Sequence, residues 1–165
     1  MLPALGGIMF PVAIVWLIFS VPVWASSTDA WNAAGGFGLT VGAPGGTQLL
    51  VSPQLEYAST PRVFMGPLIQ AGISENSIFG VSGTVRYLAG DHAKVRPCFE
   101  AGIGFAVATG ATAASPLGLL LHAGMGVDYL VGPNFAIGTV FRLNFAPPIA
   151  DFFVSWPLIV IRTAL

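Results

Sequence analysis

The chain has 165 residues and a net charge of −1, and only 8% of its residues are charged while 55% are hydrophobic. A soluble globular domain carries roughly 25% charged residues and needs them to stay dispersed, so this composition indicates a surface in contact with lipid. The few charges argue against a nucleic-acid partner, and the lone cysteine, Cys98, excludes an intramolecular disulfide and a CxxC metal site.

The N-terminal residues 1–25 carry no charge. A dense apolar stretch, Ile8–Phe19, is followed by Val23-Trp24-Ala25, which offers small or apolar residues at the −3 and −1 positions of a signal-peptidase site. This pattern predicts a signal peptide over residues 1–25 that is cleaved before Ser26. Residues 26–34 would then form a short periplasmic segment of the exported protein.

A permanent transmembrane helix is the alternative for the same segment, since about 20 apolar residues suffice to span a bilayer. No Lys or Arg precedes the apolar run, as one usually does in a signal peptide. Pro11, Pro22 and the small residue at the exit favour cleavage.

From residue 35 onward the pattern changes to runs of about ten residues with a period of two, bounded by turn residues. Eight such runs are present, at residues 35–43, 48–57, 62–72, 78–88, 94–106, 117–129, 134–146 and 153–163. An even number of strands of about 9–11 residues is typical of membrane barrels. We therefore predict an all-β fold, an eight-stranded antiparallel transmembrane β-barrel over residues 35–165, with both ends of the chain on the periplasmic side.

The two faces of these strands differ in size and polarity. In the run 94–106, for example, Phe99 and Phe105 alternate with Glu100. An eight-stranded soluble barrel would fill its interior with the bulky apolar side chains, whereas the face with glycine, short polar and charged residues would pack poorly as a dry core. The apolar face is therefore predicted to contact lipid, and closure of the sheet follows because unpaired backbone groups are costly in hydrocarbon.

Two features fit this scheme less well. Pro53, Pro67 and Pro97 lie inside predicted strands, where a proline removes a ladder hydrogen bond, so we expect bulges or strand ends there. The last run, 153–163, alternates poorly, with Ile159 on the face opposite to Trp156.

Two stretches resemble a known family: RPCFEAGIGFAV at residues 96–107 and HAGMGVDYLVGPNFAIGTVFRLNF at residues 122–145. They are similar to hairpin strands of the small eight-stranded outer-membrane β-barrel superfamily, the OmpA/OmpW-like group. The resemblance implies a barrel in the bacterial outer membrane with a structural or small-solute role and no cofactor.

The outer-membrane lipid A deacylases share the barrel and a strand like that of residues 96–104. Their catalytic strand carries a His-x-Ser-Asn element, whereas the comparable positions here are Phe141-Arg142-Leu143-Asn144. His122, the histidine within a predicted strand, is followed by Ala123 and Gly124, so no hydroxyl nucleophile lies two residues on. A non-enzymatic barrel is therefore the main hypothesis, and a lipid A-modifying hydrolase is the alternative.

Charged residues gather on the face predicted to line the lumen. They are Glu56, Arg62, Arg86, Arg96, Glu100, His122, Asp128 and Arg142. A turn centred near Ser59 would place Glu56 opposite Arg62, a favourable cross-strand pair.

The other turns give further predicted pairs. A turn centred near Gly132 would place His122 opposite Arg142. The loop after the fourth run would place Arg86 opposite Arg96, a like-charge pair for which Glu100 is the balancing carboxylate.

Three roles are open for this lumen charge network. It could form a plug of paired buried charges, a gate or solute site, or a catalytic couple of His122 and Glu100. The expected protein is a monomer in contact with outer-membrane lipids, with a structural or narrow-channel role, and a small solute or a periplasmic protein is a further candidate partner.

Overall fold

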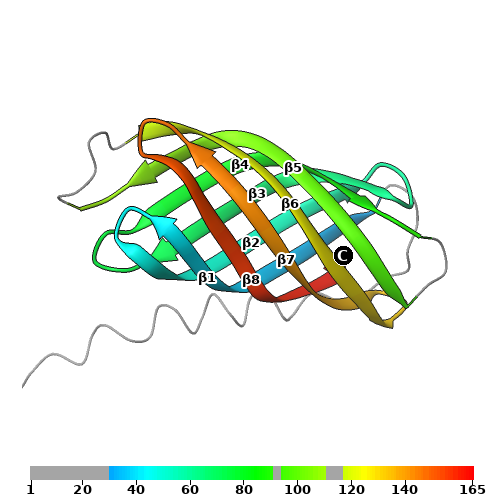
Figure 1. Cartoon of the computed structure of the whole chain (residues 1–165). Helices are drawn as coiled ribbons and strands as arrows, with labels where there is room; N and C mark the ends of the chain where they lie inside the picture. The colour runs from blue at the N-terminus through cyan, green and yellow to red at the C-terminus, as the bar shows by residue number, and fades with distance from the viewer. Residues whose placement is uncertain (1–29, 91–93, 111–116) are drawn as a thin grey trace, which may run out of the picture.

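A computed structural model describes residues 30–90, 94–110 and 117–165. These residues form eight antiparallel strands, each paired with the next, and β1 also pairs with β8, which closes the barrel (Figure 1). The strands are β1 (Trp31–Ala43), β2 (Gly46–Ala58), β3 (Val63–Ile73), β4 (Ile78–Leu88), β5 (Val95–Ala108), β6 (Leu117–Gly132), β7 (Phe135–Ala146) and β8 (Ala150–Ala164). The predicted all-β class and the closed barrel of eight antiparallel strands are confirmed.

The predicted signal peptide, residues 1–25, lies outside the described residues. β1 begins at Trp31, so the last four residues of the predicted periplasmic segment 26–34 belong to the barrel wall. In the described part of the chain, no helix is long and apolar enough to cross a membrane.

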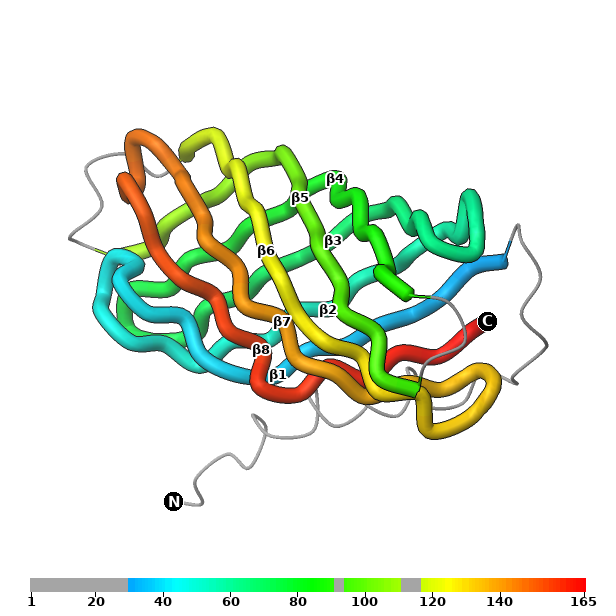
Figure 2. Tube along the Cα trace, turned by 45° about the vertical axis from the view of Figure 1, so that its right-hand side comes forward, coloured from blue at the N-terminus to red at the C-terminus, as the bar shows by residue number. Residues whose placement is uncertain are grey.

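The start of β1 and the C-terminus lie at the same end of the barrel, which we call the terminal end (Figures 1 and 2). The Leu165 amide donates a hydrogen bond of 2.7 Å to the Trp31 carbonyl there. The β1–β2, β3–β4, β5–β6 and β7–β8 connections lie at the opposite end, which we call the distal end.

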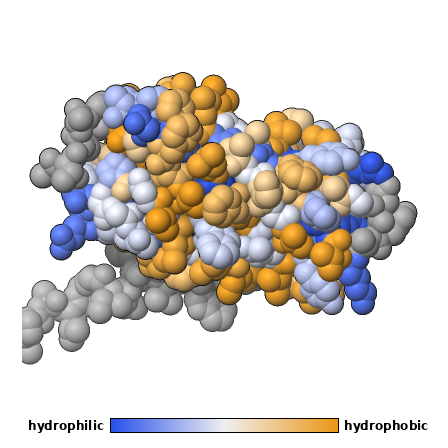
Figure 3. Space-filling model, in the orientation of Figure 1, coloured by the Kyte–Doolittle hydropathy of each residue, from blue (hydrophilic) through white to orange (hydrophobic). Residues whose placement is uncertain are grey.

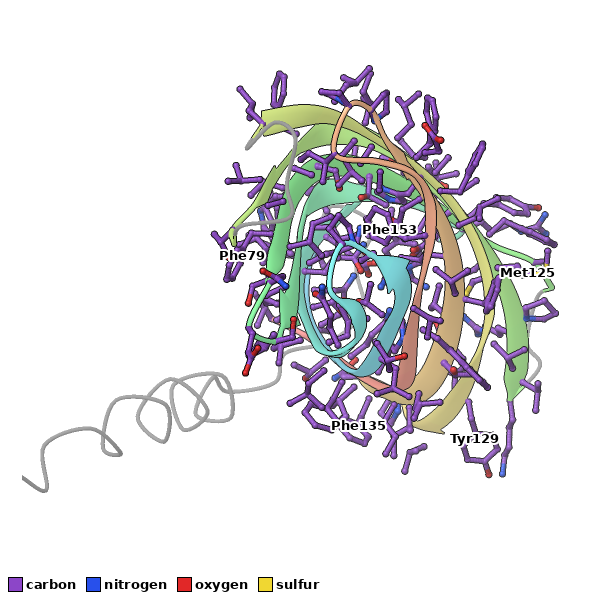
Figure 4. The ribbon with its side chains drawn as sticks, turned by 60° about the vertical axis from the view of Figure 1, so that its left-hand side comes forward. Phe79, Met125, Tyr129, Phe135 and Phe153 are labelled. Atoms are coloured by element: carbon purple, nitrogen blue, oxygen red, sulfur yellow. The ribbon has the colours of Figure 1, made fainter. Side chains whose placement is uncertain are left out.

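Apolar side chains point outward, as predicted. Phe99, Met125 and Phe141 are 50%, 62% and 46% exposed, whereas Glu100 and Arg142 are buried. The space-filling view shows hydrophobic residues over much of the wall and hydrophilic ones mostly toward the two ends (Figure 3). In Figure 4, Phe79, Met125 and Tyr129 project away from the ring of strands, while Phe153 lies within it. An apolar band of this kind is the lipid-facing surface of membrane barrels.

A ring of amphipathic aromatic residues surrounds the terminal end. Trp31 pairs with Tyr57 across β1 and β2, with their ring centroids 5.4 Å apart. Tyr87 pairs with Val63 and Tyr129 pairs with Val95, and both pairs lie at strand ends that face the terminal end. All three tyrosines of the chain therefore belong to this ring. Tyrosine and tryptophan favour the level of the lipid headgroups, which places the terminal end of the apolar band at a membrane–water interface.

The poor alternation of the last run has a structural cause. Leu158 and Ile159 are both exposed, and the register with β1 shifts between Phe37 and Gly38, which marks a bulge. The extra residue restores the alternation, so that Val160 and Arg162 point inward again.

The strand prolines behave differently from one another. The register is continuous through Pro67 and Pro97, so the expectation of a bulge is wrong at Pro67, in the middle of β3. A proline lacks a donor on one side of the strand but leaves the pairing register unchanged. Pro97 lies near the start of β5, as expected of a strand end, and the β2–β3 ladder is interrupted beside Pro53.

Candidate functional site

Four charged side chains form one layer across the lumen near the terminal end. Glu56, Arg86, Asp128 and Arg162 come from β2, β4, β6 and β8, and each is at most 5% exposed. We call them the charge quartet. Because every second strand contributes one side chain at the same height, opposite charges from strands that are not neighbours meet in the centre.

Hydrogen bonds join the quartet into a chain. Arg86 donates from Nε and Nη2 to the two carboxylate oxygens of Glu56, at 2.7 and 2.6 Å, and from Nη1 to Asp128 Oδ2 at 2.8 Å. Arg162 donates from Nη1 to Asp128 Oδ1 at 2.5 Å, and its Nε lies 3.9 Å from Glu56 Oε2. Two carboxylates and two guanidinium groups thus neutralise each other where neither could be buried alone.

A second charged layer lies closer to the middle of the barrel. Arg142 Nε donates a hydrogen bond to Glu100 Oε1, and both side chains are buried. His122 Nε2 lies 3.3 Å from the Thr84 hydroxyl, whereas His122 Nδ1 and Glu100 Oε2 have no hydrogen-bond partner in the described chain. His122 and Glu100 therefore do not form the hydrogen-bonded couple that acid–base catalysis would use.

An uncharged polar layer follows toward the distal end. Ser155 Oγ donates to Gln70 Oε1 at 2.6 Å, and Asn144 donates to Ser155 Oγ at 2.6 Å. Gln70 in turn donates to Asn144 Oδ1 at 3.2 Å. The three buried side chains close a ring of hydrogen bonds that connects β3, β7 and β8.

Apolar side chains occupy the lumen at the distal end. The cluster contains Ala43, Ile78, Ala106, Ala108, Leu120, Ala146, Ile149 and Phe153. We call it the distal plug. Its members are at most 8% exposed, so this end of the lumen is packed like a protein core.

The terminal end, by contrast, is hollow. A cavity of about 340 Å³ opens there, with the charge quartet as its floor. Above this floor the walls are mixed. They include the apolar Phe64, Leu88, Leu130 and Phe135 and the polar Asn32, Thr60, Asn134 and Thr163.

Six of the eight predicted lumen residues lie in these layers. Glu56, Arg86 and Asp128 belong to the quartet, and Glu100, His122 and Arg142 to the second layer. Arg96 is half-buried and lines the cavity. Arg62 precedes β3 and is exposed, so the prediction that it faces the lumen is wrong, because the turn extends to residue 62 and β3 starts only at Val63.

The predicted charge pairs are wrong in their partners. Tyr57 pairs with Met65, which places Glu56 beside Gly66 rather than opposite Arg62. The turn after β2 is therefore centred two residues later than Ser59.

The other two turns are also centred later than predicted. His122 faces Asn144 instead of Arg142. Arg86 faces Glu100 instead of Arg96. Glu100 nevertheless binds Arg142 across the lumen, while Arg86 is balanced by Glu56 and Asp128.

Sequence reasoning missed Arg162 and the polar ring of Gln70, Asn144 and Ser155. Arg162 follows the bulge in β8, where counting in twos from Phe153 assigns it to the wrong face if the extra residue is ignored. The signal that could have found it is the adjacent apolar pair Leu158 and Ile159, which breaks the alternation and is typical of an inserted residue. Among the described residues, no group of three His, Cys, Asp or Glu side chains could hold a metal ion.

The fold matches solved outer-membrane barrels. The chain aligns with neisserial surface protein A at a TM-score of 0.61 and 14% identity, covering 83% of this chain and 97% of that one. It aligns with the N-terminal β-barrel domain of Pseudomonas aeruginosa OprF at a TM-score of 0.63 and 15% identity, covering 84% and 98%. No model of a protein family and no curated protein matches the sequence.

A transmembrane β-barrel designed de novo also matches, with a TM-score of 0.53, 19% identity, and coverage of 86% of this chain and 100% of that one. Because a designed protein matches alongside the natural ones, the similarity concerns the barrel architecture and carries no information about function. The chain thus has the fold of the small eight-stranded outer-membrane β-barrels, and its function has to be argued from its own residues.

Proposed function

We propose that this chain is an exported, non-enzymatic barrel of the bacterial outer membrane, with a structural role and a lumen closed to free passage of solutes. The observation that carries this proposal is the orientation of the wall, with apolar side chains outside and paired charges inside. Such a surface would aggregate in water but matches the hydrocarbon core of a bilayer. Monomers surrounded by outer-membrane lipids are the expected state.

The contents of the lumen support a structural role over an open channel. The quartet, the second charged layer, the polar ring and the distal plug follow one another along the barrel axis. Eight strands enclose an interior that side chains fill. A conducting path would have to pass both the distal plug and the layers of buried ion pairs, so we expect small conductance at most.

Cell fractionation combined with N-terminal sequencing tests export and location. The mature protein is expected in the outer-membrane fraction, to begin at Ser26, and to migrate differently on gels before and after heating, because a folded barrel is compact. An inner-membrane protein that retains residues 1–25 would contradict the proposal and favour the anchored alternative.

The second candidate, a lipid A-modifying hydrolase, is favoured by one observation, the contact between His122 and the Thr84 hydroxyl. His122 is 5% exposed and points into the lumen, whereas the acyl chains of a lipid substrate would lie against the outer wall. Altered lipid A in cells that express the protein, lost in His122→Ala, would establish the hydrolase. Unaltered lipid A would support the structural role.

A further inference from the structure

We propose that the cavity at the terminal end is a binding site for a small organic acid, whose carboxylate binds Arg162 and whose apolar body packs against the cavity walls. The inference rests on the proposed function in one respect, since the periplasm is the compartment from which the ligand would enter. It goes beyond a structural role because it assigns a ligand class to one end of the lumen.

The cavity has the size and surface of a small-molecule site. Its volume of about 340 Å³ lies at the lower end of the range of roughly 300–1,000 Å³ for ligand pockets. Apolar walls with a few polar groups at one end are the usual pattern of such pockets. Phe64, Leu88 and Leu130 supply the apolar part, and the charge quartet supplies the polar end.

The hydrogen bonds of the quartet single out Arg162 as the binding group. Arg86 uses Nε, Nη1 and Nη2 for the two carboxylates, and the Phe64 ring lies 4.6 Å from its guanidinium carbon. Arg162 uses Nη1 alone, and its Nε and Nη2 are buried without a hydrogen-bond partner in the described chain. A ligand carboxylate would reach them after a side-chain movement at the floor of the cavity. Nε and Nη2 form the edge with which a guanidinium group binds a carboxylate through two parallel hydrogen bonds.

The neighbouring acids are already engaged. Both oxygens of Glu56 and both oxygens of Asp128 accept a hydrogen bond from Arg86 or Arg162. The acid nearest to the remaining edge of Arg162 is Glu56, whose Oε2 lies 3.9 Å from Arg162 Nε, beyond hydrogen-bond distance. An acceptor that completes this edge with two hydrogen bonds would therefore come from outside the quartet. Arg96 also lines the cavity.

The distal plug makes the site one-sided. Leu120, Ile149 and Phe153 pack across the lumen at the far end, and the two inner polar layers separate them from the quartet. A ligand would enter and leave through the terminal end. The barrel would thus hold an anion without passing it across the membrane.

The test uses the full-length mature barrel in lipid nanodiscs, with benzoate as the probe and benzamide as its uncharged analogue of the same shape. Binding is measured by NMR chemical-shift titration, which also reports the affected residues. We expect saturable binding of benzoate with shifts around the cavity, and binding of benzamide at least about tenfold weaker because the charge-assisted hydrogen bonds are lost.

Two variants address the site. Ala136 lines the cavity and faces Arg162 across β7 and β8, so Ala136→Leu should fill the cavity and abolish benzoate binding without removing a charge. Its matched control, Ala101→Leu, makes the same change on the exposed outer wall and should bind normally. Arg162→Gln should also lose binding.

Absence of benzoate binding to the folded barrel, equal binding of benzamide, or undiminished binding in Ala136→Leu would each overturn the inference. If Arg162→Gln fails to fold, Ala136→Leu still decides. Heat-modifiable migration and outer-membrane fractionation of the same protein report on the proposed function separately, so a folded, correctly located barrel that ignores benzoate counts against the ligand site alone.

Discussion

Arg86 and Glu56 meet across the lumen from β4 and β2, and two hydrogen bonds of 2.7 and 2.6 Å join the guanidinium group to both carboxylate oxygens. β3 lies between these two strands in the wall, so the contact connects parts of the barrel that share no backbone hydrogen bonds. Both side chains are buried, and a bidentate pair of this kind is among the strongest polar contacts. The wall is thus held together from inside as well as by its ladders.

Removing Glu56 should destabilise the barrel strongly. Glu56→Ala leaves Arg86 without its bidentate partner and removes the carboxylate nearest to Arg162 Nε, and loss of one partner of a buried ion pair costs about 3–5 kcal/mol. The measurement is urea unfolding of the barrel in lipid vesicles. Glu75→Ala, an exposed loop position, is the control and should change the free energy of unfolding by no more than about 0.5 kcal/mol. Equal effects of the two substitutions would show that the quartet does not support the wall.

The strand number, the closed barrel and the face of most lumen residues could be predicted because they depend on the alternation within each strand. Partners across strands could not. The predicted partner of Arg86 was Arg96 and the observed one is Glu100, and the predicted partner of His122 was Arg142 and the observed one is Asn144. In both cases the observed partner lies an even number of residues from the predicted one along the strand. A register shift by an odd number of residues would move every side chain to the other face of the sheet. The alternation therefore determines the face of a residue. Which residue on the same face of the next strand becomes its partner depends on the length of the turn.

Arg162 shows where the alternation itself fails. One additional residue in β8, at Leu158 and Ile159, moves every later side chain to the other face relative to a simple count. Hydrogen bonds across the lumen could not be predicted from the sequence either, because they depend on the height of each side chain along the barrel axis. The ring of Gln70, Asn144 and Ser155 joins strands that no local pattern connects.

The second charged layer should behave as a pair that can be replaced together. Arg142→Met alone leaves Glu100 as an unpaired buried charge and should cost about 3–5 kcal/mol of unfolding free energy. The double variant Arg142→Met/Glu100→Leu should recover most of this loss, since apolar residues of similar volume often substitute for a buried ion pair. A double-mutant cycle measures the coupling between the two positions. Additive losses in the double variant would argue against a direct pair.

The orientation of the wall predicts how the barrel responds to a charge on its outer face. Met125, in the middle of β6, is 62% exposed, and Met125→Arg should cost roughly 2–4 kcal/mol because the charge would enter the centre of the bilayer. Val95→Arg, at the start of β5 beside Tyr129, should cost no more than about 1 kcal/mol, since it lies near the interface. Both values come from unfolding in vesicles. If the two substitutions lowered the free energy of unfolding by similar amounts, the apolar band would not be the membrane-spanning surface.

The distal plug should control conductance, and two adjacent phenylalanines offer a matched test. Phe153 points into the plug and is 5% exposed, whereas Phe152 points outward and is 62% exposed. Phe153→Ala removes the largest side chain of the plug and leaves a cavity that water can enter from the distal end, so single-channel conductance in planar bilayers should rise above the small value expected for the unmodified barrel. Phe152→Ala removes the same atoms on the lipid side and should leave conductance unchanged. If Phe153→Ala conducts no better than Phe152→Ala, the layers of paired charge, rather than the apolar plug, are the barrier to ions.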